Sequence, residues 1–145
     1  MKQSTYGAAD MMARNLGTRL PQRHAIVPTS FVNQDNLNET NPLGRRVAIQ
    51  MASRFSQMGY SVREIKLRKN LFIKDGEGEF MLSRDLEKIR NTHNIQVALT
   101  GSYAIVQNAV HITAQLVRLK DQVILTSYDF TLPKDHNIRT LLNEY

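Results

Sequence analysis

The sequence predicts one α/β (α+β) domain of two layers, in which helices pack on one face of a mixed sheet. Two patterns predict this fold. Residues 24–68 read as strand, helix and strand, a unit that favours parallel pairing through a right-handed crossover. Residues 95–132 alternate apolar and polar side chains over three segments, which is typical of an antiparallel meander with one buried face. The length suits a single domain over 1–145, with a core of about 8–132 and a C-terminal tail of 133–145.

A helix over 8–20 and a strand over 24–32 are the first elements that we predict. Apolar residues recur at helical spacing along the helix, at Ala9, Met12, Ala13, Leu16 and Leu20. Pro21 cannot extend this helix because it lacks an N–H and clashes with the preceding turn. Pro28 lies inside the apolar strand, which indicates an edge position, a bulge or the strand's exit.

An asparagine-rich loop, residues 33–46, leads into a helix over 42–58. Asn41 is a suitable N-cap and Pro42 suits the first helical position. The helix has an apolar stripe made of Leu43, Val47, Met51, Phe55 and Met58, flanked by Ala48 and Ala52. The match is imperfect, since Arg54 falls within the stripe and Ile49 falls outside it. Gly59 is well placed to end the helix in a left-handed conformation.

The middle of the chain reads as a strand, a hairpin and a short helix. Residues 60–68 return from the preceding helix as a strand, and 71–82 form a hairpin with "DGEG" at its turn. Ser83 can cap a helix over 84–93, whose expected buried residues are Leu86 and Ile89.

Three strands are expected over 95–106, 109–119 and 122–132. Their shared face comprises Ile95, Val97, Leu99, Tyr103, Ile105, Val110, Ile112, Ala114, Leu116, Ile124, Tyr128, Phe130 and Leu132. His111 should therefore point to the other face, and Gly101 indicates close packing or a bulge. One or two helical turns are expected in the tail.

The net charge of +6 comes from 19 basic and 13 acidic residues, with the excess in the first half and a local run at 63–69. Such a balance can support binding to nucleic acid or to an anionic surface, but a solvated, partly paired face also explains it and is favoured. Neither zinc-finger spacing nor an aromatic–basic RNA-binding pattern accompanies the run, so we expect no nucleic-acid partner. The sequence has no cysteine, no window apolar enough for a membrane span and no signal-peptide core.

The sequence offers little for catalysis. Histidines stand at 24, 93, 111 and 136, without the short spacings of a local metal clamp. "TGSYA" around Ser102 has only one glycine of a nucleophile elbow and lies within a strand. The carboxylates at 75, 77 and 79 cluster in a turn that should be exposed. We therefore expect no enzyme, no catalytic residue, no cofactor and no metal.

The 33–46 loop is the candidate binding site. Its start-of-helix geometry, followed by two arginines, could hold a phosphate, a nucleotide or a carboxylate, although no P-loop motif is present. Asparagine also has a structural use, because its side chain bonds nearby backbone in turns. The favoured reading is a shaped loop that presents a recognition surface, in which Gly44 allows close backbone approach and Arg45 makes a charged contact. The candidate residues are Asn33, Asp35, Asn38, Asn41, Pro42, Gly44 and Arg45.

Three blocks of the chain resemble the FlgO family of bacterial envelope proteins. They are "SFVNQDNLNETNPLGRRVAIQMASRF" (30–55), "GEFMLSRDLEKI" (78–89) and "GSYAIVQNAVHITAQLVRLKDQVILTS" (101–127). The resemblance covers most of residues 8–132, and the first block is its most specific part. It implies a small non-enzymatic domain, similar in topology to the envelope adaptor domains typified by LpoB and the N-terminal part of TolB.

The resemblance also implies a location and a class of partner. Members of the family with assigned roles are outer-membrane-associated, often lipoproteins, and linked to the flagellum and motility. We therefore expect a protein–protein adaptor at the periplasmic face of the outer membrane, with envelope or flagellar proteins as partners. Membrane contact is expected only through a lipid anchor, whose leader and acylated cysteine are absent from this chain. A module that binds a small anion or a nucleotide at the start of the 42–58 helix is the alternative.

Overall fold

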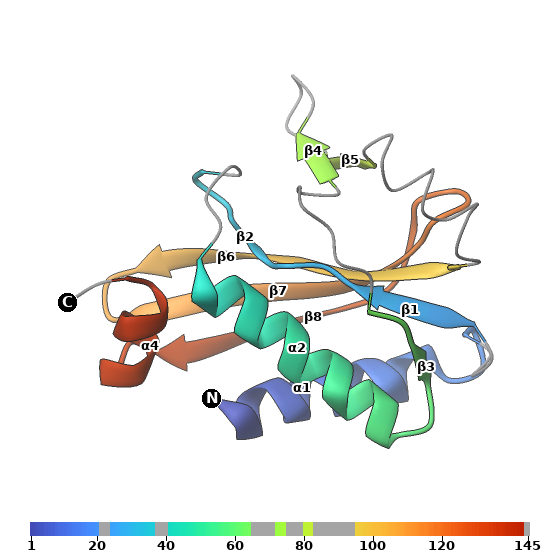
Figure 1. Cartoon of the computed structure of the whole chain (residues 1–145), viewed down its shortest axis with the longest axis horizontal. Helices are drawn as coiled ribbons and strands as arrows, with labels where there is room; N and C mark the ends of the chain where they lie inside the picture. Colours follow the sequence, from blue (N-terminus) through green and yellow to red (C-terminus); the bar gives the residue numbers. More distant parts are fainter. Residues whose placement is uncertain (21–23, 37–40, 65–71, 75–79, 83–94, 144–145) are drawn as a thin grey trace.

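The structure is a computed structural model that describes residues 1–20, 24–36, 41–64, 72–74, 80–82 and 95–143. It has helices on one face of a mixed sheet, as predicted (Figure 1). The elements are α1 Lys2–Leu16, β1 Ala25–Pro28, β2 Val32–Asn33, α2 Pro42–Gln57, β3 Ser61–Val62, β4 Phe72–Lys74, β5 Phe80–Leu82, β6 Val97–Val106, β7 Ala109–Arg118, β8 Val123–Pro133 and α4 His136–Leu141.

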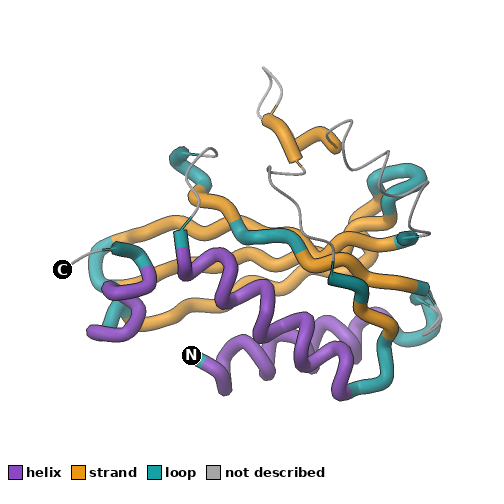
Figure 2. The backbone as a smooth tube through the Cα atoms, viewed as in Figure 1, coloured by secondary structure: helices purple, strands orange, loops and turns teal. Residues whose placement is uncertain are grey.

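The main sheet is six-stranded and has the order β3-β1-β6-β7-β8, with β2 also paired to β6 (Figure 2). β1 pairs in parallel with β3 and β6, and β2 pairs in parallel with β6, so the predicted crossover through α2 is confirmed. β6, β7 and β8 form the predicted antiparallel meander. β6 is therefore the strand where the parallel and antiparallel halves of the sheet join.

The two long helices form the second layer. α1 packs against α2 and β8, and α2 packs against the parallel part of the sheet and β6 (Figure 1). The core between the layers is apolar, and its largest fully buried side chains include Met12, Phe31, Met51, Phe55 and Tyr103. Burial of this apolar surface is the main force that holds helices and sheet together.

Helix α1 begins earlier and ends earlier than the predicted 8–20. It starts at Lys2 and ends at Leu16, where Gly17 has a positive φ of 55°. The polar stretch before Ala8 gives no apolar periodicity, but Thr5 is fully buried and its hydroxyl bonds Gln50 of α2. A buried polar contact therefore anchors the part of the helix that precedes its apolar stripe.

Helix α2 follows the prediction closely, whereas the strand predicted over 24–32 is replaced by two shorter strands, β1 and β2. The stripe from Leu43 to Phe55 is buried, and Ile49 is exposed. Gly59 follows the helix with φ 97°, a left-handed conformation that a residue with a Cβ rarely adopts. Pro28 is the last residue of β1, in agreement with its reading as a strand exit.

The meander departs from prediction at Ile124. A register shift between Leu116 and Val117 places Thr126 opposite Leu116 and Ile124 opposite Val117, so Leu125 is skipped. Leu125 is consequently buried, whereas Ile124 is 51% exposed and does not belong to the core. Strict alternation is wrong here because a bulge changes the face on which each residue lies. His111 is exposed while Val110 and Ile112 are buried, so it lies on the other face, as predicted.

The predicted hairpin and the predicted helical tail are both present. β4 and β5 pair in antiparallel fashion, which confirms the hairpin, and α4 confirms the helical tail. Asp135 caps α4 by accepting a hydrogen bond from the Ile138 N–H at 2.9 Å, and Ile138 is buried in the core. The "DGEG" turn, residues 65–68 of the predicted strand and the helix predicted over 84–93 lie outside the described residues.

Candidate functional site

The described part of the asparagine-rich loop begins with a tight turn that Asn33 organises. Its side-chain Oδ1 accepts a hydrogen bond from the Asp35 N–H at 2.9 Å, and its carbonyl accepts one from the Asn36 N–H at 3.1 Å. Asn33 also pairs with Tyr103 in the β2–β6 ladder. The asparagine therefore shapes the turn, and Asp35 is left exposed at its tip. Asn38 lies outside the described residues.

Asn41 connects the start of α2 to the sheet. Its Oδ1 accepts a hydrogen bond from the Gly44 N–H at 3.2 Å, which is the predicted N-cap, and Pro42 occupies the first turn. Its side-chain amide nitrogen donates to the Tyr103 hydroxyl of β6. Asn41 is buried, so both ends of its amide are used inside the protein. One of the N–H groups that an anion would need at this helix start is already taken by Asn41.

Phe31 packs closely against two glycines, Gly44 and Gly101. A Cβ on Gly44 would lie 2.0 Å from the Phe31 carbonyl oxygen, and the Phe31 N–H donates to the Gly44 carbonyl at 3.1 Å. On the other side, a Cβ on Gly101 would lie 2.5 Å from the ring of the same phenylalanine. The close approach expected at Gly44 and the close packing expected at Gly101 are thus both present, and Phe31 takes part in both. At Gly101 the Thr113 carbonyl oxygen is also close, 2.4 Å from such a Cβ.

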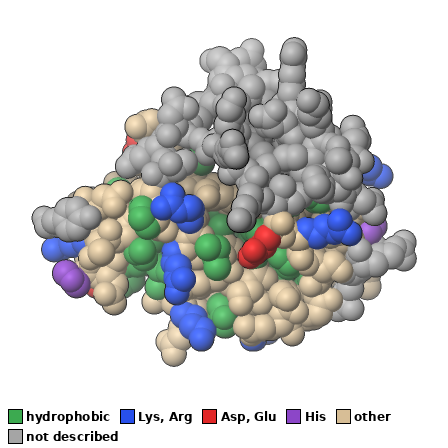
Figure 3. Space-filling model, in the orientation of Figure 1, with side chains coloured by type: hydrophobic (Ala, Val, Ile, Leu, Met, Phe, Trp, Pro, Cys, Tyr) green, Lys and Arg blue, Asp and Glu red, His purple; other side chains and the backbone are tan. Residues whose placement is uncertain are grey.

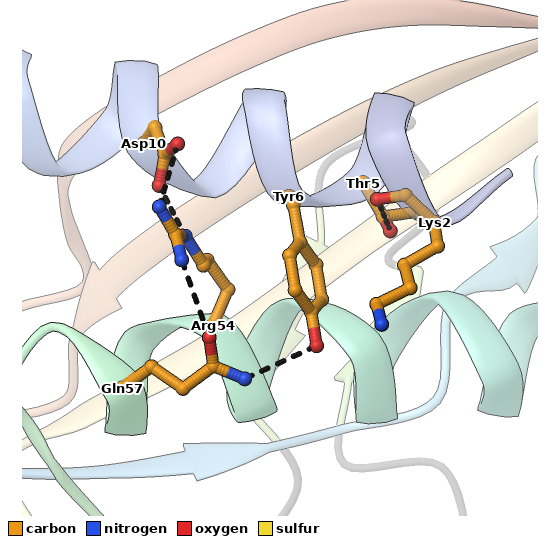
Figure 4. A network of polar contacts seen from close by, with 6 residues as sticks. All are labelled: Lys2, Thr5, Tyr6, Asp10, Arg54 and Gln57. Atoms are coloured by element: carbon orange, nitrogen blue, oxygen red, sulfur yellow. Dashed lines mark hydrogen bonds and ion pairs between the residues drawn. The ribbon is translucent and has the colours of Figure 1, made fainter.

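A second polar cluster fastens α1 to α2 (Figure 4). Arg54 forms an ion pair with Asp10 at 2.6 Å and donates to Gln57 at 3.2 Å. Gln57 in turn donates to the Tyr6 hydroxyl at 3.2 Å. The hydrogen bond from Ser53, followed by that from Gln57, lowers the pKa of Tyr6 below its usual value. Sequence reasoning missed this cluster because part of its α1 half precedes the predicted start of the helix.

The sequence profile of the FlgO protein family matches residues 6–137, which is most of the chain. The chain belongs to the FlgO family. None of the curated proteins compared with this FlgO-family domain matches it significantly in sequence.

Solved structures resemble this FlgO-family domain in fold. The LpoB C-terminal domain from Salmonella enterica has a TM-score of 0.65 at 11% identity, covering 90% of this chain and 96% of that one. The Escherichia coli LpoB C-terminal domain has a TM-score of 0.54 at 15% identity, covering 88% and 97%. A PelC dodecamer from Paraburkholderia phytofirmans has a TM-score of 0.53 at 15% identity, covering 79% and 74%. At such identities the likeness shows the fold alone.

The first and third of the blocks that carry the FlgO resemblance meet in space. Phe31 from the first block packs on Gly101 from the third, and Asn41 bonds Tyr103, two residues after that glycine. These contacts hold Phe31 and the start of α2 against β6. The contacts of Asn33, Asn41 and Gly44 thus stabilise the fold. Asp35 and Arg45 are exposed, and their side chains form no ion pair or side-chain hydrogen bond with the residues that the structure describes.

Metal ligands and the position of Ser102 are the remaining features of the described part of the FlgO-family domain. Within these residues, no three His, Asp or Glu side chains are grouped so that they could hold a metal ion. Ser102 lies in the middle of β6, paired with Thr113 and Val32, rather than on a strand-to-helix turn. No helix among the described residues is long and apolar enough to cross a bilayer.

Proposed function

We propose that this FlgO-family protein is a non-catalytic protein of the bacterial envelope that acts as a protein–protein adaptor at the periplasmic face of the outer membrane. Its partners are envelope or flagellar proteins, and its role is in flagellar assembly, stability or motility. The observation that carries the proposal is the family match over residues 6–137. The fold shared with the LpoB C-terminal domain supports it, since one small domain architecture serves both chains.

The surface that we assign to the partner is the exposed part of the 33–46 loop. Asp35 and Arg45 are exposed, and the contacts of Asn33, Asn41 and Gly44 hold them in place. Residues held in this way lose little conformational entropy on binding, which favours affinity. Replacing Arg45 by alanine should therefore weaken partner binding without loss of the fold.

The location is tested by expressing the full-length product of the native gene and fractionating the cells. Recovery in the outer membrane supports the proposal, whereas a soluble cytoplasmic product would refute it. Motility of a deletion strain, restored by the wild-type gene, tests the flagellar role separately. Unchanged swimming and normal flagella in that strain would remove the flagellar role and leave the envelope location standing.

The partner surface is tested by photo-crosslinking in cells. A crosslinking residue in place of Asp35 should capture a defined envelope protein, and the Arg45→Ala substitution should reduce that capture. Arg14→Ala is the matched control, because Arg14 is an exposed arginine in the last turn of the other long helix. Equal effects of Arg45→Ala and Arg14→Ala would show that the loop does not recognise the partner.

A further inference from the structure

The outward face of α2 carries an apolar side chain next to two arginines. Ile49 is 52% exposed, and Arg45 and Arg46 lie four and three residues before it, which places all three on neighbouring positions of the helix surface. Both arginines are exposed, and neither forms an ion pair or side-chain hydrogen bond with another residue in the described ranges. The exposed isoleucine and the two arginines without side-chain partners in the described ranges are therefore available to a binding partner.

Helix α1 lies alongside this part of α2, because the Thr5 hydroxyl donates to Gln50, the residue after Ile49. Lys2 is exposed, with its Nζ 5.3 Å from the centre of the Tyr6 ring. Figure 4 shows that Lys2 and Tyr6 both reach from α1 toward α2. On the face seen in Figure 3, Lys and Arg side chains lie beside exposed hydrophobic ones. We call Lys2, Tyr6, Arg45, Arg46 and Ile49 the Ile49 face.

The charge of the helical layer is strongly one-sided. The two long helices contain one acidic residue, Asp10, against the basic residues Lys2, Arg14, Arg45, Arg46 and Arg54. Asp10 is already engaged by Arg54 in an ion pair of 2.6 Å. The Ile49 face therefore has a positive potential that no side chain of α1 or α2 neutralises.

Polar contacts join the two helices that carry this face. The Thr5 hydroxyl is 2.8 Å from Gln50 Oε1, and Arg54 binds both carboxylate oxygens of Asp10, so α1 and α2 cannot slide easily past one another. The bond between Asn41 and Tyr103 fixes the start of α2 on the sheet. A surface built on two fastened helices presents its side chains in a defined arrangement, as tight recognition requires.

We propose that the Ile49 face docks an acidic segment of a partner protein, whose carboxylates engage Arg45, Arg46 and Lys2 while an apolar side chain covers Ile49. The inference rests on the adaptor function proposed above and adds the chemistry of the partner. It also extends the recognition surface from the loop, through Arg45, to the helical layer. Arginine beside an apolar centre is typical of protein-binding hot spots.

Other anionic partners fit this face less well. An amphipathic helix that enters a lipid surface needs a wide apolar side, whereas α2 exposes only Ile49 among its large apolar residues. Single-stranded nucleic acid needs stacking aromatic rings, but the ring on this face is half-buried and bonded through its hydroxyl to Gln57. A protein segment is the occupant that uses both the charge and the isoleucine.

The test places the photo-crosslinker p-benzoylphenylalanine at position 49 of the full-length protein in its native cells. Position 124 is the matched control, because Ile124 is an isoleucine with nearly the same exposure, 51%, on the edge strand β8. The crosslinked peptides are identified by mass spectrometry. We expect position 49 to give at least about tenfold more of one defined, net acidic protein segment than position 124.

Charge reversal supplies the second arm. Arg45→Glu combined with Arg46→Glu should reduce the position-49 crosslink by about tenfold or more, whereas Arg14→Glu should leave it within about twofold. Equal crosslinking at positions 49 and 124, a segment without acidic character, or lipid as the crosslinked species would each overturn the inference. If the crosslinker at Asp35 captures a protein and position 49 does not, the inference fails and the adaptor function stands. Capture from neither position would refute both.

Discussion

Gly44 packs so closely on Phe31 that adding one methyl group at this position should lower the stability of the fold. In Gly44→Ala the new Cβ would lie 2.0 Å from the Phe31 carbonyl oxygen, so the helix or the strand exit must move. Such overpacking costs about 1–3 kcal/mol. The movement also breaks the hydrogen bond from the Phe31 N–H to the Gly44 carbonyl, and a buried unpaired N–H costs about 1–3 kcal/mol.

One term opposes these losses. Alanine is favoured over glycine within a helix by about 1 kcal/mol. The net expectation is that Gly44→Ala lowers the free energy of unfolding by about 3 kcal/mol, the sum of the central values. With a urea m-value of about 2 kcal/mol/M, the unfolding midpoint should fall by about 1.5 M.

Gly7→Ala is the matched control for this experiment. Gly7 also lies in a long helix, but a Cβ there meets nothing within 4 Å. The same substitution should therefore stabilise the protein by about 0.5–1 kcal/mol at this position. Both variants can be unfolded in urea and followed by circular dichroism at 222 nm. A Gly44→Ala midpoint equal to or above that of wild-type would refute the close-approach explanation.

Three further predictions concern individual side-chain hydrogen bonds. Asn41→Asp should keep the helix cap but lose the donor to Tyr103, so its unfolding free energy should lie between those of wild-type and Asn41→Ala, the latter losing about 2 kcal/mol in urea titrations. Tyr6 should ionise at a lower pH than an ordinary tyrosine, because the hydrogen bond from Ser53 lowers its pKa; Ser53→Ala should move the 295 nm absorbance titration upward. The hydrogen bond from Arg118 lowers the pKa of Asp121, so the contribution of this carboxylate to stability is present above its unfolded-state pKa and is lost as the pH falls through the lower folded-state value. In Arg118→Ala, NMR titration of Asp121 should show a raised pKa and that pH dependence should shrink.

Much of the fold follows from local pattern. The cap at Asn41, the apolar stripe of α2 and the left-handed Gly59 are all readable from neighbouring residues, and the structure shows each of them. The meander is readable too, because alternation persists over three segments. Ile124 could not be placed correctly, since a bulge depends on how β8 pairs with β7 and leaves no mark in the alternation itself.

Individual residues of the candidate site can be predicted from the sequence, but the contacts between them cannot. Gly44 and Gly101 each suggested close packing, yet nothing in the sequence says that both glycines pack on Phe31. The partner of the Asn41 amide, Tyr103, lies 62 residues away and comes from another element. Such contacts depend on tertiary arrangement, which single-sequence patterns do not encode. The family blocks were the only signal that these distant segments belong together.

The division of the sheet at β6 has a consequence for the order of folding. β6, β7 and β8 are joined by short turns, so their pairing closes small loops at low entropic cost. β1 reaches β6 only across a long stretch of chain, as the bond between the Ala25 N–H and Gln96 over a separation of 71 residues shows. We expect the meander to form first and the N-terminal half to dock later, which would make folding slow for a chain of this size. In amide hydrogen exchange, β7 should then stay protected longest, while β1 and β3 open before the whole domain unfolds.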